Sequence, residues 1–317
     1  MHRGTYASAM ARVERLDLDV GGLGPDGVDS IAADLYVPEG SSAAPLMVCL
    51  PGGAMDRTYF DLPDRLPGEW SMARYLVDHF GIAVAVMDHP GVGGSSTPDD
   101  PYTLNPRVVA TVDHGALSEL VGHAMDLFEP TRLIGLGHSM GAMVVAHTQW
   151  HHRSFDAVAL LGFGGAGLPE HLTSTEKSYA GDYDRLELVL AELVLERFGT
   201  AIVPSPTSGS ESTSAGRISR PKELLETAST SMLAMCGLSS MIPGISDRAM
   251  ASIDVPVFIG LGEHDIAGDI ANVAALATSS PAVTTFVLEG AGHNHSISRN
   301  RTELWDALGR WALDLDR

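Results

Sequence analysis

A serine between two glycines stands where an apolar run gives way to a helix-like run, in the stretch GHSMG at residues 137–141. Residues 131–136 before it are short and apolar, as a buried parallel strand should be, and residues 142–147 after it favour a helix. A serine at such a junction exposes its hydroxyl at the top of a sheet, and the glycines leave room for the neighbouring strand and helix. Ser139 is therefore the candidate nucleophile, and an ordinary turn residue is the alternative.

A serine hydroxyl needs a base that removes its proton and an acid that orients the base. Downstream, one apolar strand-like run leads into GEHD (262–265) and a later one into GAGHNH (290–295). The carboxyl ends of parallel strands meet at one edge of a sheet, where ligands bind. We therefore expect both loops near Ser139. The candidate acids are Asp265 and Glu263, and the candidate bases are His293 and His295.

The elements that must position these residues alternate along the chain. Strand-like runs cover 12–20, 31–37, 45–50, 82–87, 131–136, 155–161, 256–261 and 283–288, and helical patterns cover 70–80, 107–128, 142–147, 270–277 and 301–313. Turn-rich residues between the first two strands predict a hairpin. The remaining alternation predicts an α/β fold, a mostly parallel sheet with helices on both faces.

One segment interrupts this alternation. Between residues 164 and 251 there is no convincing strand, whereas 184–198 and 221–237 have helical apolar patterns. The Pro- and Ser-rich tract 204–214 that joins them is predicted to be flexible. The sequence thus predicts an all-helical cap at 164–251, inserted between two parts of one core, 1–163 and 252–317.

Composition narrows the possible partners. The chain has 317 residues and a formal net charge of −20, so nucleic acid and anionic membranes would be repelled. This negative charge has two interpretations: it keeps the protein soluble, or it guides a cationic substrate. Its two cysteines make no disulfide framework. Neither a leader segment nor a membrane-spanning run is apparent, so we expect a cytoplasmic protein.

Five short motifs occur in a specific order, namely PGG, DHPGVGGS, GHSMG, GEHD and GAGH. Each is weak alone, but together, from residue 45 to the final helix, the chain resembles the α/β-hydrolase superfamily. The resemblance implies an eight-stranded, mainly parallel sheet, a cap between the sixth and seventh strands, and the catalytic triad Ser139, Asp265 and His293. His295 and Glu263 remain alternatives for the base and the acid. His264 and the pair at 151–152 are expected to be surface groups.

An oxyanion hole should use the backbone N–H of Met140, directly after the nucleophile, and one N–H from the loop PGGA at 51–54. Gly53 is the predicted second donor and Ala54 the alternative. This loop departs from the family's more frequent His-Gly pattern, and proline at position 51 has no N–H to donate. We expect no cofactor and no metal, because no carboxylate or cysteine cluster completes a site around the HNH run at 293–295.

Several side chains could line a pocket for a small-molecule substrate. Methionines of the predicted cap would supply a deformable apolar surface, and aromatic residues follow the PGGA loop. Packing in the core is the competing interpretation for all of them. The candidates are Ala54, Tyr59, His138, Met232 and Met235, with Phe60, Asp61 and Met241 as neighbours.

The predicted function is hydrolysis of a small to medium, largely apolar carboxylic ester or lactone through an acyl-enzyme on Ser139. The Ser-Met-Gly sequence at 139–141 also occurs in family members that hydrolyse carbon–carbon bonds of vinylogous diketones, so that reaction is an alternative. Thioester hydrolysis is another, although the cap lacks an Arg or Lys cluster for coenzyme A. A receptor that binds a small ligand without turnover is a third. The substrate, the pathway and the oligomeric state are left open.

Overall fold

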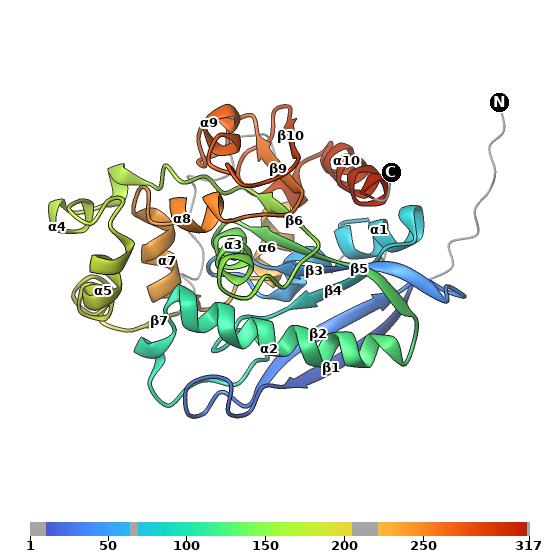
Figure 1. The fold of residues 1–317 in the computed structure, drawn as a ribbon, viewed down its shortest axis with the longest axis horizontal. Coiled ribbons are helices and arrows are strands. Elements are labelled where there is room, and N and C mark those ends of the chain that lie inside the picture. Colours follow the sequence, from blue (N-terminus) through green and yellow to red (C-terminus); the bar gives the residue numbers. More distant parts are fainter. Residues whose placement is uncertain (1–10, 64–68, 205–220, 316–317) are drawn as a thin grey trace.

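The structure, a computed structural model, describes residues 11–63, 69–204 and 221–315. Eight strands form one sheet in the order β1-β2-β4-β3-β5-β6-β9-β10 (Figure 1). Strand β2 is antiparallel to its neighbours β1 and β4, and every other pair is parallel, which confirms the predicted sheet. The strands are β1 (Arg12–Asp19), β2 (Ser30–Val37), β3 (Ala43–Leu50), β4 (Ala83–Met87), β5 (Glu129–His138), β6 (Ala157–Leu161), β9 (Val257–Gly262) and β10 (Val283–Leu288).

Burial along the strands explains why the sequence forms this sheet. Every residue of β4, β6 and β9 is buried, as expected for central strands covered on both faces. In β4, Ala83, Ala85 and Met87 belong to one apolar cluster and Val84 and Val86 to another. Because side chains alternate across a strand, these two clusters are the cores on the two faces of the sheet.

Helices cover each of these faces. Helices α1 (Met72–Phe80) and α10 (Arg301–Asp314) contribute to the second cluster and lie side by side in Figure 1. Helices α2 (Pro106–Met125), α3 (Met140–His152) and α9 (Ile270–Ala274) contribute to the first. Local signals set the helix ends: the Ser71 side chain accepts a hydrogen bond from Arg74 N at the start of α1, and Gly81 ends it in the left-handed conformation.

The segment between β6 and β9, called the inserted segment below, differs from the predicted all-helical cap in one respect, because it is not purely helical. Two short strands, β7 (Ile202–Val203) and β8 (Met232–Leu233), pair antiparallel within it. This pairing divides the predicted helix 221–237 into two, since residues in a ladder cannot also continue a helix. The helices of this segment are η3 (Pro169–His171), α4 (Ser174–Lys177), α5 (Tyr183–Phe198), α6 (Pro221–Thr227), α7 (Ala234–Met241) and α8 (Asp247–Ala251).

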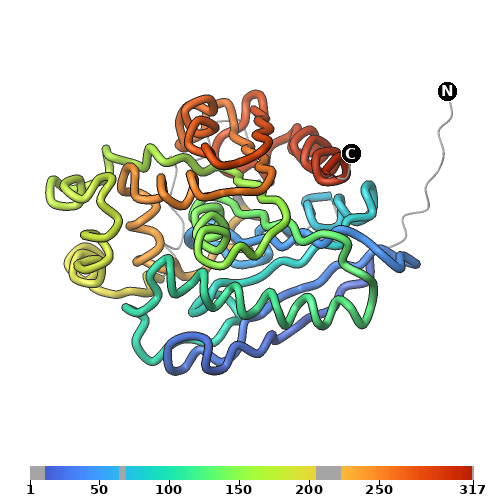
Figure 2. The backbone as a smooth tube through the Cα atoms, viewed as in Figure 1, coloured from blue at the N-terminus to red at the C-terminus, as the bar shows by residue number. Residues whose placement is uncertain are grey.

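Helices α4, α5 and α7 gather at one end of the molecule, on the left in Figure 1, and the tube in Figure 2 shows the same segment on the left, from yellow-green to light orange. Side chains of α5 and α7, together with Leu172 at the end of η3, form a third apolar cluster. Of the tract 204–214, predicted as flexible, all but Pro204 lies outside the described residues. The division into domains at 163/164 and 251/252 stays a prediction.

Candidate active site

Ser139 lies at the sharp turn between β5 and α3. Its backbone has φ 53° and ψ −121°, a conformation that is costly for a residue with a side chain. The turn is held by the Ser139 N–H, which donates to Leu161 O in the neighbouring strand at 2.8 Å, and by Ser139 O, which accepts from Ala142 N at 2.9 Å. Strained geometry kept by the surrounding structure is a feature of functional positions.

The glycines that flank Ser139 are required by close backbone packing. A Cβ atom on Gly137 would lie 2.4 Å from Ala142 N, and one on Gly141 would lie 2.3 Å from Leu50 O. Both distances are too short for any real side chain, and both contacts are with backbone atoms that cannot swing away. The two glycines therefore bring β3, β5 and α3 close together around the serine.

We expect Gly141→Ala to lower the free energy of unfolding by about 3 kcal/mol, because the added methyl group must displace the β3 backbone. Urea denaturation followed by circular dichroism measures this change. Gly122→Ala in α2 is the matched control, since a Cβ there meets nothing within 4 Å. The control should stabilise the protein by about 0.5–1 kcal/mol, because alanine is the better helix former. Equal effects of the two substitutions would contradict the proposed packing requirement.

His293 connects Ser139 to Asp265. Its Nε2 lies 2.9 Å from Ser139 Oγ, and its Nδ1 lies 2.8 Å from Asp265 Oδ1. His293 and Asp265 come from the loops after β10 and β9, so the shared sheet edge brings together residues that are far apart in sequence. His138 supports the arrangement, because its Nε2–H donates to the carbonyl oxygen of His293 at 2.9 Å.

The side chain of Asp265 is 0% exposed and accepts four hydrogen bonds. His293 Nδ1–H and the N–H of Ala267 donate to Oδ1, while His295 Nε2–H and the N–H of Gly262 donate to Oδ2. Burial alone would raise the pKa of this carboxyl, but the hydrogen bonds from the two histidines outweigh burial and hold the pKa well below its usual range. Asp265 therefore remains a carboxylate at neutral pH and acts as an acceptor only.

The alternatives for the base and the acid, His295 and Glu263, have other partners than Ser139. His295, in η5 (His295–Ile297), contacts Asp265 and not Ser139, and burial lowers its pKa. Glu263 is exposed and accepts a hydrogen bond from Gly290 N at 2.8 Å. His264 is also exposed. The hydrogen-bonded chain from Ser139 therefore runs through His293 to Asp265.

The loop after β3 lies against the serine turn. A Cβ atom on Gly52 would lie 3.2 Å from Ser139 Cβ, and one on Gly53 would lie 3.7 Å from Met140 Sδ and 3.6 Å from Met232 Sδ. Within the described part of the chain, the hydrogen bonds assign no protein acceptor to the N–H of Gly53 or of Met140. The predicted oxyanion donors thus belong to the loop after β3 and to the first residue of α3, which meet beside Ser139.

The same loop pairs with the inserted segment. Met55 forms an isolated antiparallel bridge with Ser229, and Thr230 N–H donates to Ala54 O at 2.9 Å. Ala54 has φ 62°, in the left-handed region that favours glycine. Residues 228–230 therefore hold Ala54 in place, and β8 follows directly with Met232 beside Gly53.

The remaining pocket candidates are divided between the site and the cores. Tyr59, in η1 (Arg57–Phe60), is buried and stacks on His138 with ring centroids 4.7 Å apart. Phe60 is buried beside Tyr59, with their rings edge to face. Met235 is buried in the cluster formed by the inserted segment itself. Met232, in contrast, is partly exposed beside Gly53.

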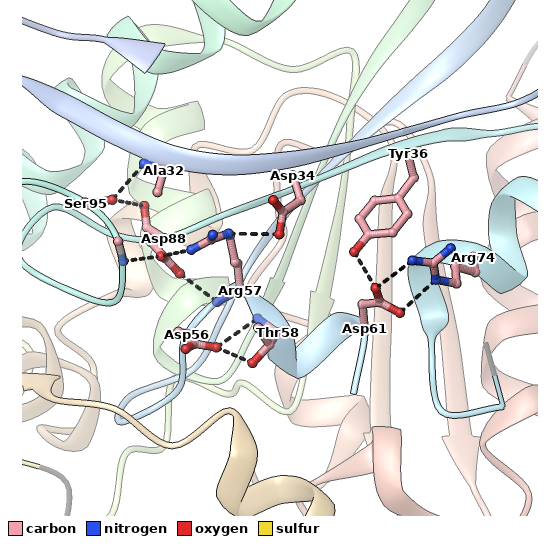
Figure 3. A network of polar contacts seen from close by, with 11 residues as sticks. Ala32, Asp34, Tyr36, Asp56, Arg57, Thr58, Asp61, Arg74, Asp88 and Ser95 are labelled. Carbon is pink, nitrogen blue, oxygen red and sulfur yellow. Dashed lines mark hydrogen bonds and ion pairs between the residues drawn. The ribbon is translucent and has the colours of Figure 1, made fainter. Parts of the chain in front are cut away.

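Ion pairs fix η1, which follows the Gly53 loop, to the sheet (Figure 3). Arg57 contacts Asp34 of β2 at 3.0 Å and the fully buried Asp88 at the end of β4 at 2.5 Å. Farther along, Asp61 accepts from Tyr36 Oη at 2.6 Å and pairs with Arg74 of α1 at 3.2 Å. From the sequence, Asp61 is expected beside the pocket, and no role is predicted for Arg57, Asp34 or Asp88.

In the ranges that the structure describes, no group of three or more His, Cys, Asp or Glu side chains is arranged to hold a metal ion. No helix within those ranges is long and apolar enough to span a bilayer.

Comparison with known families matches residues 47–307 to the alpha/beta hydrolase family, so the chain belongs to this family. No curated protein sequence matches the chain. Together with the eight-stranded sheet, the family membership identifies the protein as a hydrolase of the α/β fold.

Solved structures with the same fold are similar at low sequence identity. A thermophilic esterase from Thermogutta terrifontis has a TM-score of 0.57 and 16% identity, with 95% of this chain and 99% of that chain covered. An enol-lactonase from Burkholderia xenovorans LB400 has a TM-score of 0.58 and 18% identity, with 90% and 96% covered. A bromoperoxidase from Bacillus anthracis has a TM-score of 0.58 and 17% identity, with 95% and 100% covered. At these identities the likeness shows the fold alone.

Proposed function

We propose that this protein is a serine hydrolase that cleaves carboxylic esters or lactones through an acyl-enzyme on Ser139. The observation that supports the proposal is the unbroken hydrogen-bonded chain from Ser139 Oγ through His293 to Asp265. In an enzyme of this fold, such a chain activates a serine hydroxyl. The esterase and the enol-lactonase among the similar structures agree with this reaction class.

The protonation of His293 follows from its two partners. Because the Asp265 carboxylate can only accept a hydrogen bond, the proton of neutral His293 lies on Nδ1. Nε2 then presents its lone pair to the Ser139 hydroxyl at 2.9 Å. As Ser139 Oγ attacks the substrate carbonyl, His293 accepts the hydroxyl proton and Asp265 stabilises the imidazolium that forms.

The negative charge that develops on the carbonyl oxygen needs hydrogen-bond donors. We assign these donors to the backbone N–H groups of Gly53 and Met140, on either side of Ser139. The protonated His293 next delivers its proton to the leaving alcohol or to the opened ring oxygen of a lactone. A water molecule then attacks the acyl-enzyme, with His293 as base, and releases the acid and free Ser139.

Methionine side chains indicate an apolar acyl group. The thioethers of Met140 and Met232 both lie within 4 Å of the position that a Cβ on Gly53 would take, so flexible apolar atoms border the proposed oxyanion donor. The nearby loop also pairs with residues 228–230 of the inserted segment. We therefore propose that β8 contributes to the binding of a small to medium, largely apolar acyl chain.

A panel of p-nitrophenyl esters from acetate to hexanoate tests this substrate class. We expect kcat/KM to rise with chain length, by up to about fourfold for each added CH₂ that is buried, since each is worth about 0.8 kcal/mol. An aliphatic lactone and a thioester of equal chain length should be assayed in parallel. A flat or falling ester series would contradict an apolar acyl site. Preference for the thioester would favour the thioesterase alternative.

A further inference from the structure

A buried pair of titratable side chains lies next to the candidate site and has no role in the mechanism above. His89 follows β4 and is 0% exposed, and Asp113 lies in α2 and is 1% exposed. His89 Nε2 lies 2.9 Å from the carbonyl oxygen of Pro51, in the loop that leads to Gly53. His89 Nδ1 faces Asp113 Oδ2 at 3.7 Å.

The partners of His89 determine where its protons lie. A carbonyl oxygen can only accept, so Nε2 carries a proton and donates it to Pro51 O. On the other side, the Asp113 oxygens have no hydrogen-bond partner among the described residues, and a lone pair on Nδ1 would repel a buried carboxylate. A proton therefore belongs between Nδ1 and Asp113, whether on the imidazole or on the carboxyl. In both cases Nε2 remains a donor to Pro51.

The pKa values of the pair agree with a shared proton. Burial raises the pKa of Asp113, and its contact with His89 only partly offsets this. Burial alone would lower the pKa of His89, but the close contact with Asp113 and the charge of Asp113 outweigh burial and raise it. Both shifts favour retention of a proton by the pair at neutral pH.

Pro51 is in a position to control the Gly53 N–H. A Cβ on Gly141 would lie 2.4 Å from Pro51 O, so this carbonyl packs against the serine turn. The next carbonyl, that of Gly52, accepts a hydrogen bond from Met55 N at 3.2 Å. Because a peptide unit is planar, holding the Gly52 carbonyl also orients the Gly53 N–H on the same unit. The two successive peptide units before Gly53 are thus oriented by the His89 ring and by the N–H of Met55.

We propose that His89, oriented by Asp113, is a positioning residue for the oxyanion hole: its Nε2–H holds the Pro51 carbonyl so that the Gly53 N–H points at the reacting carbonyl oxygen. The inference rests on the proposed function, because that function assigns the oxyanion role to Gly53. His89 touches no reacting atom and acts only through the loop backbone. Preorganised donors are effective because they need no rearrangement during the reaction.

The test compares substitutions of His89 that keep or remove the donor. His89→Phe keeps a ring of similar size without an N–H and should lower kcat on p-nitrophenyl butyrate by about 10- to 100-fold, with KM changed less than about threefold. His89→Gln can donate its amide N–H to Pro51 O and should recover kcat to within about fivefold of wild type. A trifluoromethyl ketone, which forms a tetrahedral oxyanion on the serine, should lose affinity for the Phe variant by the same factor as kcat.

The controls separate this positioning role from simple packing. His147→Phe replaces another fully buried histidine, in α3 and about two turns beyond Ser139, and should leave kcat unchanged. Asp113→Asn can donate its amide N–H to Nδ1 and so still orient the ring, whereas Asp113→Leu leaves Nδ1 without a partner. We therefore expect the Asn variant to be clearly more active than the Leu variant. Equal losses in the Phe and Gln variants, or wild-type kcat in a folded His89→Phe, would overturn the inference.

Failure of the inference can be told apart from failure of the proposed function. The proposed function fails if the wild-type protein does not hydrolyse esters, or if hydrolysis does not depend on Ser139. For the inference there is also a readout without turnover, the ¹⁵N chemical shifts of the His89 ring in the wild-type protein. We expect Nε2 to be protonated at neutral pH. An unprotonated Nε2 would overturn the inference even if the Phe and Leu variants do not fold.

Discussion

Ser139→Ala is expected to lower ester turnover by about 10⁴- to 10⁶-fold while the protein remains folded. The substitution removes the attacking oxygen and adds nothing to a turn that already accommodates a Cβ atom with φ 53°. Only the slow attack of water on a substrate held by the oxyanion donors would remain. Steady-state hydrolysis of p-nitrophenyl butyrate measures the loss, and thermal melting shows that the fold is intact.

A fluorophosphonate probe gives an independent readout of the same residue. It should label the wild-type protein at Ser139 and leave Ser139→Ala unlabelled. Ser239→Ala is the matched control, because Ser239 is a buried serine of α7 with 2% exposure and no part in the proposed site. The control should keep both turnover and labelling. Near-normal turnover by Ser139→Ala would remove the basis of the proposed mechanism.

The second large effect is expected at His293. His293→Gln should lower kcat/KM by about 10⁴-fold or more, because glutamine cannot accept the proton of Ser139. His295→Gln should cost less than about tenfold, because the glutamine amide can replace the hydrogen bond to Asp265 Oδ2 without touching Ser139. Steady-state kinetics on one ester, with both variants checked for folding, gives the comparison.

This pair of variants decides between the two histidines that the sequence proposes as the base. Each is the control for the other, since both contact the same carboxylate at 2.8 Å. If His295→Gln were the inactive variant and His293→Gln retained turnover, the base would be His295. The Ser139–His293 contact would then play no part in catalysis.

Much of the fold follows from local patterns. The strand before Ser139 and the helix after it are predicted because an apolar run, a glycine-bounded turn and a helix-forming run follow each other directly. The two loops that carry Asp265 and His293 are predicted because each directly follows an apolar strand. The division of residues 221–237 is missed, because the pairing of Met232–Leu233 depends on Ile202–Val203, about thirty residues away.

The roles within the site depend on contacts that no spacing reveals. His293 and His295 are two residues apart, and from the sequence only the family resemblance favours His293 over His295. Their different contacts around Asp265 show which ring reaches Ser139. The sequence predicts no role for His89 of the DHPGVGGS motif, although its position at the end of a strand is the same signal that points to His293. Its partners, Pro51 and Asp113, come from separate elements.

The sequence by itself determined the sheet, the serine turn and the pair of loops at its edge, because these follow from apolar periodicity and the backbone requirements of neighbouring residues. Only the tertiary structure decided which imidazole reaches Ser139, which carbonyl His89 holds, and how the inserted segment meets the Gly53 loop. The physical reason is range: a hydrogen bond forms only within about 3 Å, and sequence separation does not set distances of that size across a folded chain.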